Sequence, residues 1–492
     1  MMAIGLSILS AALLSLSFSS YNFWFLAWCG FIPLFMALEN KSLRQALFIS
    51  FFCGVIFWSL TVYWLVHVTL LGLVILILYL AVYFGFFGGI FYSLRFIPVS
   101  IALLFLPASW ILLEYLRSYL FTGFPWALLG FSQYKNLPII QIADIAGTGG
   151  VGFLIILVNL AFYLALRKKL KLRIALVCAA ILLAALIYGY FRLNPGTVSL
   201  SNEKSLKISV IQGNIPQHLK WNKQSADFIL KRYQELTSQA AIQDKPELII
   251  WPEASVPGLL YQDREEFYQV FSLANQLKIN LLVGAVSRID ENYFNSALLI
   301  SPAGVLSAIY HKLHLVPFGE YIPLKKTFPF LETVAPIGDI QPGREFTIFR
   351  QPANFGVLIC FEDLFPKLSR EFVKRGAKFL VNITNDAWYK KTSAPYQHFA
   401  ASVFRSVENR IYLARSANTG ISGFIDPQGR ILGVVQDSLD KEIFVQGYSS
   451  QSIDLVSGKR TVYNRYGDFF VFLCLLFNIS VVIFFLVKKN EQ

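Results

Sequence analysis

The sequence predicts two parts: a multi-pass α-helical membrane domain of about eight spans and an α/β domain. Hydrophobic residues make up 55% of the 492 residues and charged residues only 15%, against roughly a quarter charged in an ordinary soluble protein. The apolar residues form long runs, and no Asp, Glu, Lys or Arg occurs in 45–94. Region 194–467 instead alternates short β-rich runs with helix-like segments. These observations exclude a simple soluble enzyme.

Runs of about 17–25 apolar residues predict membrane helices. We expect a membrane domain of seven helices over 1–193, an extramembrane domain over 194–467, and a last helix with a short tail over 468–492. The first run has no basic residues before it, which favours a retained helix over a signal peptide. The expected spans are 3–20, 23–38, 45–66, 70–94, 98–121, 146–166, 172–193 and 468–487.

The net charge of +13 could suggest a nucleic-acid partner, but its distribution argues against one. Residues 203–467 carry 30 Lys and Arg against 25 Asp and Glu, which leaves 13 against 5 in the rest of the chain. The excess basic residues lie in short loops between apolar runs, where they indicate membrane topology. No nucleic-acid partner is expected.

The loop charges also predict an orientation. Ten basic residues follow even-numbered spans and three lie on the other side, which predicts that both termini are cytoplasmic. Region 194–467 would then lie outside the cytoplasm, which is the periplasm if the chain resides in the inner membrane of a diderm bacterium. The ten residues are Lys41, Arg44, Arg95, Arg167, Lys168, Lys169, Lys171, Arg173, Lys488 and Lys489, and the three are Arg117, Lys135 and Arg192.

Two features of the membrane part invite a structural or a functional interpretation. Glu114 and Arg117 are three residues apart on one predicted helix, so a paired charge near the interface is favoured over a substrate contact. The loop 122–145 is rich in aromatic and Pro residues. It is interpreted either as part of an aromatic belt or as a lipid-facing arm.

Strand-like and helix-like segments alternate along 194–467, and this alternation predicts an α/β layered domain. The expected strands are 206–212, 247–251, 279–285, 296–301, 355–360, 378–384 and 420–425, and the expected helices are 222–242, 264–277, 366–376 and 396–412.

Three residues suited to acyl transfer follow strand-like runs in this domain: Glu253, Lys312 and Cys360. A carboxylate can accept the proton of a thiol, the thiolate can attack a carbonyl, and an ammonium can stabilise the oxyanion that forms. The other four cysteines lie in apolar runs, so no disulfide framework is expected. A buried, inert thiol is the alternative interpretation of Cys360.

A metal site is not favoured. His311 and His314 are three residues apart, but no third ligand accompanies them at a metal-site spacing. His398 lies in a helix-like stretch and is interpreted as a structural histidine. No metal and no cofactor are therefore expected.

Several strings resemble those of the bacterial apolipoprotein N-acyltransferases, and the resemblance covers nearly the whole chain. It implies eight membrane helices and one domain of the carbon-nitrogen hydrolase (nitrilase) type, which is an αββα sandwich. The strings are VIQGNIPQ at 210–217, IWPE at 250–253, HKLHLVPFGEYIP at 311–323, LICFE at 358–362, TNDAW at 384–388, RSANTG at 415–420 and TGFPW at 122–126.

The resemblance implies a role for each of the three residues. Cys360 would be the nucleophile, Glu253 the general base and Lys312 the oxyanion stabiliser. Supporting or substrate-binding roles are implied for Glu320, which would orient the lysine, for Glu362 beside the nucleophile, for Trp221 on a loop near the lipid, and for Phe361 and Asn385.

The chain departs from the family pattern at two places. Phe361 stands where the family often has Tyr, so a hydroxyl is absent there. The family commonly continues TNDAW with an aromatic residue, Gly and Asp, whereas this chain has Tyr389, Lys390 and Lys391. The second departure bears on local loop contacts more than on the chemistry.

The implied function is transfer of an acyl chain from a membrane phospholipid, such as phosphatidylethanolamine, to the N-terminal amine of S-diacylglyceryl-cysteine on an apolipoprotein. The reaction would pass through a thioester on Cys360, and the chain would act as a monomer. One alternative is a membrane-tethered amidase that delivers the acyl group to water. The other is a non-catalytic membrane protein that binds lipoproteins.

Overall fold

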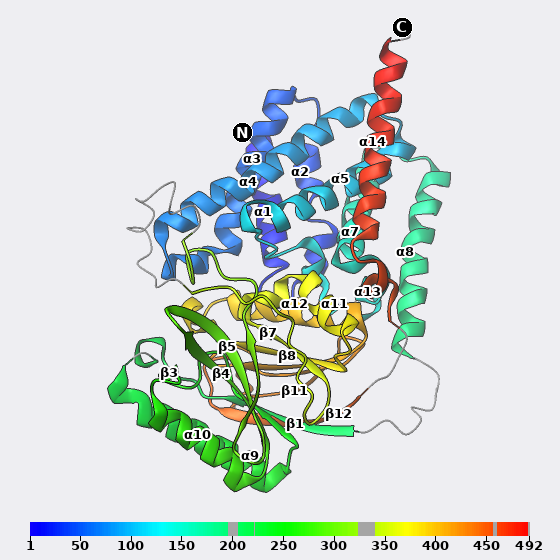
Figure 1. Cartoon of the computed structure of the whole chain (residues 1–492). Coiled ribbons are helices and arrows are strands. Elements are labelled where there is room, and N and C mark those ends of the chain that lie inside the picture. The colour runs from blue at the N-terminus through cyan, green and yellow to red at the C-terminus, as the bar shows by residue number, and fades with distance from the viewer. Residues whose placement is uncertain (195–204, 221, 323–339, 456–459, 491–492) are drawn as a thin grey trace. The chain divides into compact units, whose positions relative to one another are not determined.

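The computed structural model describes residues 1–194, 205–220, 222–322, 340–455 and 460–490. The chain forms two compact units. A helical unit comprises Met1–Val66, Leu70–Gly196 and Thr461–Gln492, and an α/β unit comprises His67–Thr69 and Thr197–Arg460. Figure 1 shows the elements of both units.

Six helices in the described part of the helical unit are long and apolar enough to cross a membrane, which confirms the predicted multi-pass architecture. The first two expected spans are shorter: α1 covers Met2–Leu16, and the second is divided into η1 (Trp24–Trp28) and α2 (Ile32–Ala37), where Pro33 lies in the first turn. The six long helices are α3 (Leu43–Thr61), α4 (Leu70–Ser93), α5 (Val99–Tyr119), α7 (Ala143–Leu166), α8 (Leu172–Leu193) and α14 (Phe469–Asn490).

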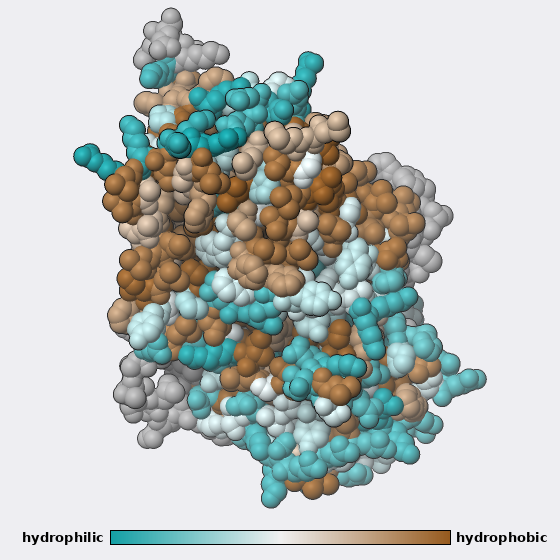
Figure 2. Space-filling model, turned by 180° about the vertical axis from the view of Figure 1, so that it is seen from behind, coloured by the Kyte–Doolittle hydropathy of each residue, from teal (hydrophilic) through white to brown (hydrophobic). Residues whose placement is uncertain are grey.

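The outer surface of the helical unit is strongly apolar, and Figure 2 shows hydrophobic residues gathered over it. Such a continuous exposed apolar surface would be unfavourable in water and is favourable in a bilayer. The chain is therefore a membrane protein. Exposed residues on three of its helices include Leu71, Ile75 and Phe86 of α4, Leu176 and Val177 of α8, and Leu476, Ile483 and Phe484 of α14.

Buried polar side chains join distant segments of the helical unit. Asn159 of α7 donates to the carbonyl of Ala27 at 2.9 Å and accepts from the N–H of Phe31 at 2.9 Å. Asn478 of α14 donates to Ser109 Oγ of α5 at 2.8 Å. These bonds fix the short second apolar segment and the last helix against the central helices.

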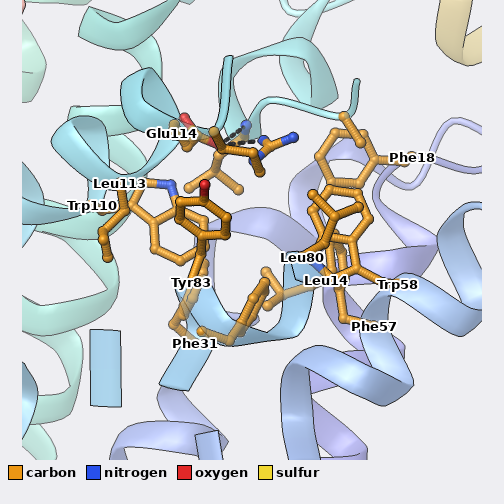
Figure 3. Close-up of a pocket in the computed structure, with 14 residues that line it drawn as sticks. Leu14, Phe18, Phe31, Phe57, Trp58, Leu80, Tyr83, Trp110, Leu113 and Glu114 are labelled. Atoms are coloured by element: carbon orange, nitrogen blue, oxygen red, sulfur yellow. Dashed lines mark hydrogen bonds and ion pairs between the residues drawn. The ribbon is translucent and has the colours of Figure 1, made fainter. Parts of the chain in front are cut away.

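Glu114 and Arg117 form the predicted pair, with Arg117 Nη2 3.7 Å from Glu114 Oε1. Arg117 also donates to the carbonyls of Phe124 and Trp126, so the pair holds the loop that follows α5. Trp126 is only 1% exposed, so this tryptophan of the loop packs inside the protein. Figure 3 shows an aromatic pocket in this unit to which Glu114 contributes.

The α/β unit contains two sheets. The larger has the order β12-β1-β2-β4-β5-β6, with β3 paired to β4, and the smaller has the order β11-β10-β9-β8-β7. The larger sheet is built from β1 (Ser205–Gln212), β2 (Leu248–Ile250), β3 (Leu259–Leu260), β4 (Asn280–Ile289), β5 (Asn292–Ile300), β6 (Leu306–His311) and β12 (Gly447–Asp454), and the smaller from β7 (Phe355–Ile359), β8 (Phe379–Thr384), β9 (Tyr412–Ala417), β10 (Gly423–Ile425) and β11 (Ile431–Val434).

The two sheets pack face to face, with β1 against β9, and a helical layer covers each outer face (Figure 1). Helices α9 (Ala226–Asp244) and α10 (Arg264–Leu277) lie on the larger sheet, and α11 (Pro366–Lys374) and α12 (Ala394–Asn409) lie on the smaller. Strands β2, β7 and β8 are buried along their whole length, as expected for strands covered on both faces. This is the predicted αββα sandwich.

All seven expected strands are present, and the structure contains further strands that were not expected. One expected helix is shorter than predicted: the helix over 396–412 ends at Asn409, because Arg410 adopts a left-handed conformation (φ 54°) and the chain enters β9. Strands β11 and β12 were not expected. β12 reads GYSSQSID and is an edge strand paired with β1, so it lacks the apolar pattern of a covered strand.

Candidate active site

The three predicted reactive residues each follow a strand of the α/β unit. Glu253 follows β2, Lys312 follows β6 and Cys360 follows β7. All three are buried, with 7%, 1% and 7% of their surfaces exposed. A Cβ atom at Gly284 of β4 would collide with the main chain at Pro252 and Glu253, so glycine there allows this close approach. The fold thus brings three segments, which together span more than 100 residues of the sequence, into one site.

Lys312 lies between two carboxylates. Its Nζ is 2.9 Å from Glu320 Oε2 and 3.6 Å from Glu253 Oε1. Burial opposes the charged form of Lys312, but Glu320 and Glu253 outweigh this effect and raise its pKa above the ordinary value. Lys312 is therefore held as an ammonium, which is the form that can stabilise an oxyanion.

Asn295 of β5 joins the two carboxylates. Its Nδ2 donates to Glu253 Oε1 at 2.7 Å and to Glu320 Oε1 at 2.8 Å. Both acids thus share one amide donor and one ammonium, which fixes the Glu253 carboxylate in place. Sequence reasoning missed Asn295, because an Asn inside a strand carries no distinctive signal.

Cys360 occupies a strained turn. Its φ is +53°, a left-handed conformation that non-glycine residues rarely adopt, and it begins the 3-10 helix η9 (Cys360–Leu364). Its main-chain carbonyl lies 3.2 Å from Asn382 Nδ2 and 3.2 Å from His398 Nε2. These two contacts to the Cys360 carbonyl stabilise the turn that carries the thiol.

The thiol is neutral in the resting site. Burial raises the pKa of Cys360 well above its ordinary value, and the negative charge of Glu253 raises it further, while Lys312 opposes the rise. A thiol held protonated in this way needs a base when it reacts, and Glu253 lies close enough for its charge to act on the Cys360 thiol.

Glu362 is fully buried two residues after Cys360 and gathers four donors. The N–H groups of Leu313 and His314 lie 2.6 and 3.0 Å from its Oε1, and the N–H of Ile359 lies 2.7 Å from its Oε2. The Tyr310 hydroxyl donates to it at 2.9 Å. Glu362 therefore joins the segment after Lys312 to the segment around Cys360, and it acts on the site through these segments.

A network of buried charged side chains includes Asp363 of η9. His398 Nε2 is 2.9 Å from Asp363 and its Nδ1 is 2.9 Å from Asp386, while Arg415 Nη1 is 2.8 Å from Asp363. All four side chains are completely buried. His398 thus has the structural role expected of it, and Asp386 is ion-paired with His398 and Arg415.

Three further residues were given supporting roles by the resemblance: Asn385, Phe361 and Trp221. Asn385 donates to Gln217 at 2.7 Å and accepts from Asn418 at 3.0 Å, so it contacts the loop after β1. The Phe361 ring is buried and packs on His314 and Phe365, at centroid distances of 6.1 and 5.3 Å. Trp221 lies outside the described residues.

The two histidines considered as metal ligands have other contacts. His311 Nδ1 lies 2.8 Å from Ser296 Oγ, and the His314 ring packs on Phe365 with centroids 3.8 Å apart. Within the described ranges, no group of three His, Cys, Asp or Glu residues has a metal-binding arrangement.

The two parts of the chain match two known families. Residues 10–161 match the apolipoprotein N-acyltransferase N-terminal domain, and residues 207–452 match the carbon-nitrogen hydrolases. An apolipoprotein N-acyltransferase of Geobacter metallireducens is 37% identical over 496 residues, which cover 96% of this chain and 92% of the relative. The chain belongs to the apolipoprotein N-acyltransferase family.

Other members of the apolipoprotein N-acyltransferase family agree with this assignment. The relative from Chlorobaculum tepidum is 30% identical over 465 residues, covering 86% of this chain and 87% of its own. Among solved structures, Saccharomyces cerevisiae Nit3, a member of branch 10 of the nitrilase superfamily, covers 51% of this chain and 90% of its own at 18% identity and a TM-score of 0.38. The curated relatives and the two family matches show a membrane acyltransferase with a carbon-nitrogen hydrolase domain, as the sequence motifs predicted.

Proposed function

We propose that this protein transfers an acyl chain from a membrane phospholipid to the N-terminal amine of S-diacylglyceryl-cysteine on an apolipoprotein. One observation carries the proposal: Glu253, Lys312 and a strained Cys360 lie together in one buried site. Family membership supplies the acceptor class, and the apolar helical unit is suited to a donor that resides in the bilayer.

In the first half-reaction, Cys360 Sγ attacks the ester carbonyl carbon of the phospholipid, and Glu253 takes the thiol proton. Lys312 stabilises the oxyanion of the tetrahedral intermediate. The ester C–O bond then breaks, and Glu253 returns the proton to the departing lysophospholipid oxygen. The product on the enzyme is a Cys360 thioester.

In the second half-reaction, the neutral α-amine of the acceptor attacks the thioester carbonyl. Glu253 takes a proton from the nitrogen, the C–S bond breaks, and the proton returns to the Cys360 sulfur. The amide product leaves and the resting site is restored. A thiolate departs readily, so one difficult ester-to-amide exchange becomes two easier steps.

The membrane arrangement follows from the same proposal. We place the membrane domain at 1–193 and 468–492, the catalytic domain at 194–467 outside the cytoplasm of a bacterial inner membrane, and both termini inside. The ten-to-three distribution of loop basic residues supports this orientation. Anchoring beside both lipid substrates raises their effective concentration at the thiol. We propose that the enzyme acts as a monomer, with every described group of the site supplied by one chain.

The test uses the full-length protein purified in detergent with phosphatidylethanolamine and a diacylglyceryl-cysteinyl peptide. We expect the peptide to gain the mass of one acyl chain, and phospholipid alone to leave an acyl thioester on Cys360. Cys360→Ala should abolish both products. Cys178→Ala, which alters a cysteine of helix α8, is the matched control and should retain them.

The outcomes separate the alternatives. Release of free fatty acid without peptide acylation would indicate an amidase-type hydrolase, and peptide binding without any acyl product would indicate a non-catalytic binding protein. An active Cys360→Ala enzyme would overturn the covalent mechanism.

A further inference from the structure

Lys220 is a second buried lysine beside the candidate active site. It is 5% exposed, and its Nζ donates to the main-chain oxygen of Glu253 at 3.0 Å. Among the described residues, this main-chain oxygen is the hydrogen-bond acceptor of the Lys220 ammonium. An ammonium carries three donors, and burying it with a single neutral acceptor is costly. We therefore expect the charge of Lys220 to interact with other charged groups of the site.

Loop contacts from the opposite sheet position Lys220. It ends the short helix η6 (Gln217–Leu219) in the loop after β1. Asn418, which follows β9, accepts from the N–H of Ile215 at 2.8 Å and donates to the carbonyl of Ile215 at 2.8 Å. Asn385, which follows β8, holds Gln217 at 2.7 Å. The ammonium is therefore placed by the fold and is not a chance surface lysine.

The charges of the site explain what a second ammonium could do. Lys312 contacts both oxygens of Glu320, at 3.0 and 2.9 Å, so these two charges form a matched pair. Glu253 lies farther from Lys312, at 3.6 Å. Without Lys220, the group of Glu253, Glu320 and Lys312 would carry one uncompensated negative charge. Lys220 brings the group to neutrality.

Two further charged sets lie nearby and leave this balance unchanged. Glu362 has four hydrogen-bond donors of its own, and burial raises its pKa to about 7, so it is only partly charged at neutral pH. Asp363 and Asp386 are paired with His398 and Arg415. The charges that act on Lys220 are those of Glu253 and Cys360.

We infer that Lys220 is an electrostatic positioning residue for acyl transfer, whose ammonium remains the counter-charge while negative charge moves from the Glu253 carboxylate to the Cys360 sulfur and then to the acyl oxygen. The inference rests on the proposed function. During these steps the proton moves from sulfur to Glu253 and back, so the negative charge changes its place but not its amount. The Lys220 ammonium interacts electrostatically with both groups and stabilises every stage of this movement.

The inference predicts a pH dependence. Burial lowers the pKa of Lys220 to about 8, although Glu253 and Cys360 oppose the shift. Lys220 is charged below this pH and loses its charge above it. The rate of Cys360 acylation should therefore fall as the pH rises through about 8. Lys220→Arg retains its charge throughout this range, so the fall should disappear.

The experiment measures single-turnover acylation of Cys360 by phosphatidylethanolamine from pH 6 to 10, together with carbamidomethylation of Cys360 by iodoacetamide. At pH 7, Lys220→Met should slow both reactions by about 100-fold, the lower end of the range for a lost preorganised electrostatic contribution. Lys220→Arg should largely restore them. Lys231→Met, which removes an exposed lysine of α9, should behave as the wild type.

The two readouts separate failure of this inference from failure of the proposed function. If the wild type forms no thioester, the proposed function is wrong, and the iodoacetamide rates still test Lys220. Wild-type rates in Lys220→Met, or an unchanged fall above pH 8 in Lys220→Arg, would overturn the inference. The Arg variant retains the buried charge and provides a decision even if the Met variant does not fold.

Discussion

His398 Nε2 lies 3.2 Å from the main-chain carbonyl oxygen of Cys360, so a buried imidazole supports the strained turn that carries the thiol. The same ring lies between Asp363 and Asp386, each at 2.9 Å. Although burial disfavours the charged ring, these carboxylates raise the pKa of His398 to about 9. The turn is therefore supported by an imidazolium at neutral pH.

Replacing His398 by Gln should destabilise the protein and slow acylation. The substitution leaves two buried carboxylates with one cation, and loss of one partner from a buried ion pair costs about 3 kcal/mol or more. Thermal unfolding in detergent and thioester formation measure the two effects. The double variant with Asp386→Asn removes the surplus charge and should recover part of the stability. No recovery would show that the charge balance does not matter.

The same residue predicts a pH dependence of stability. The folded-state pKa of about 9 exceeds the ordinary value of 6.5, so the folded protein binds this proton more tightly than the unfolded chain. The stabilisation is complete below pH 6.5 and is lost as the pH rises through 9. Melting temperatures across this range should fall in the wild type and fall less in His398→Gln.

Glu362 should produce a separate change at lower pH. Burial raises its pKa from 4.5 to about 7, so the folded form favours the protonated acid and stability decreases as the pH rises between these values. Glu362→Gln should flatten the melting profile from pH 4.5 to 7. Glu265→Gln, at an exposed position of α10, should leave it unchanged. Identical profiles for both variants would contradict this role.

Replacing Asn295 by Leu should impair the reaction more than the fold. The substitution removes the amide that contacts both Glu253 and Glu320, so the two carboxylates share only Lys312. We expect thioester formation to slow by about 100-fold, as for loss of one preorganised donor. Gln276→Leu removes an exposed amide of α10 and should retain the wild-type rate. A normal rate in Asn295→Leu would show that Glu253 needs no such support.

In the helical unit, Asn478→Leu should weaken the contact of α14 with α5 by removing the bond to Ser109. Hydrogen bonds between membrane helices contribute about 0.6 kcal/mol on average and up to about 1.7 kcal/mol. Reversible unfolding in mixed micelles provides the measurement. Ser109→Ala should cost a similar amount, and the double variant should cost no more than either change alone. Additive losses would indicate independent roles.

The position of much of the candidate site was predictable because its residues stand at the ends of apolar strands. Glu253, Lys312 and Cys360 share this pattern, and a layered α/β fold gathers strand ends. Lys220 has no such local signal. Its burial depends on Asn418, about 200 residues away in the chain, which holds the loop after β1. Long-range contacts of this kind leave no pattern in a single sequence.

The sequence predicts the elements whose apolar content matches their burial. It does not predict elements, such as β12, whose place depends on pairing instead. The long helices of the membrane part are almost purely apolar, so their length and composition suffice. Strand β12 is half-exposed and rich in Ser, and its place is set by pairing with β1. Trp126 is of a residue type that is common at membrane interfaces, but its ring packs against Trp64, with ring centroids 4.7 Å apart.

The antiparallel pairing of β1 with β12 has a consequence for biogenesis. Ser205 and Asp454 are register partners, so the first and last strands of the α/β unit lie side by side, and the chain continues after β12 to α14. Because a ribosome makes the chain from its N-terminus, helix α14 emerges only after the whole hydrolase sequence has been translated. Until then α5 lacks its Asn478 partner. Completion of the helical bundle thus waits for synthesis of the enzyme domain, and a stop codon in that domain leaves the membrane part unfinished as well.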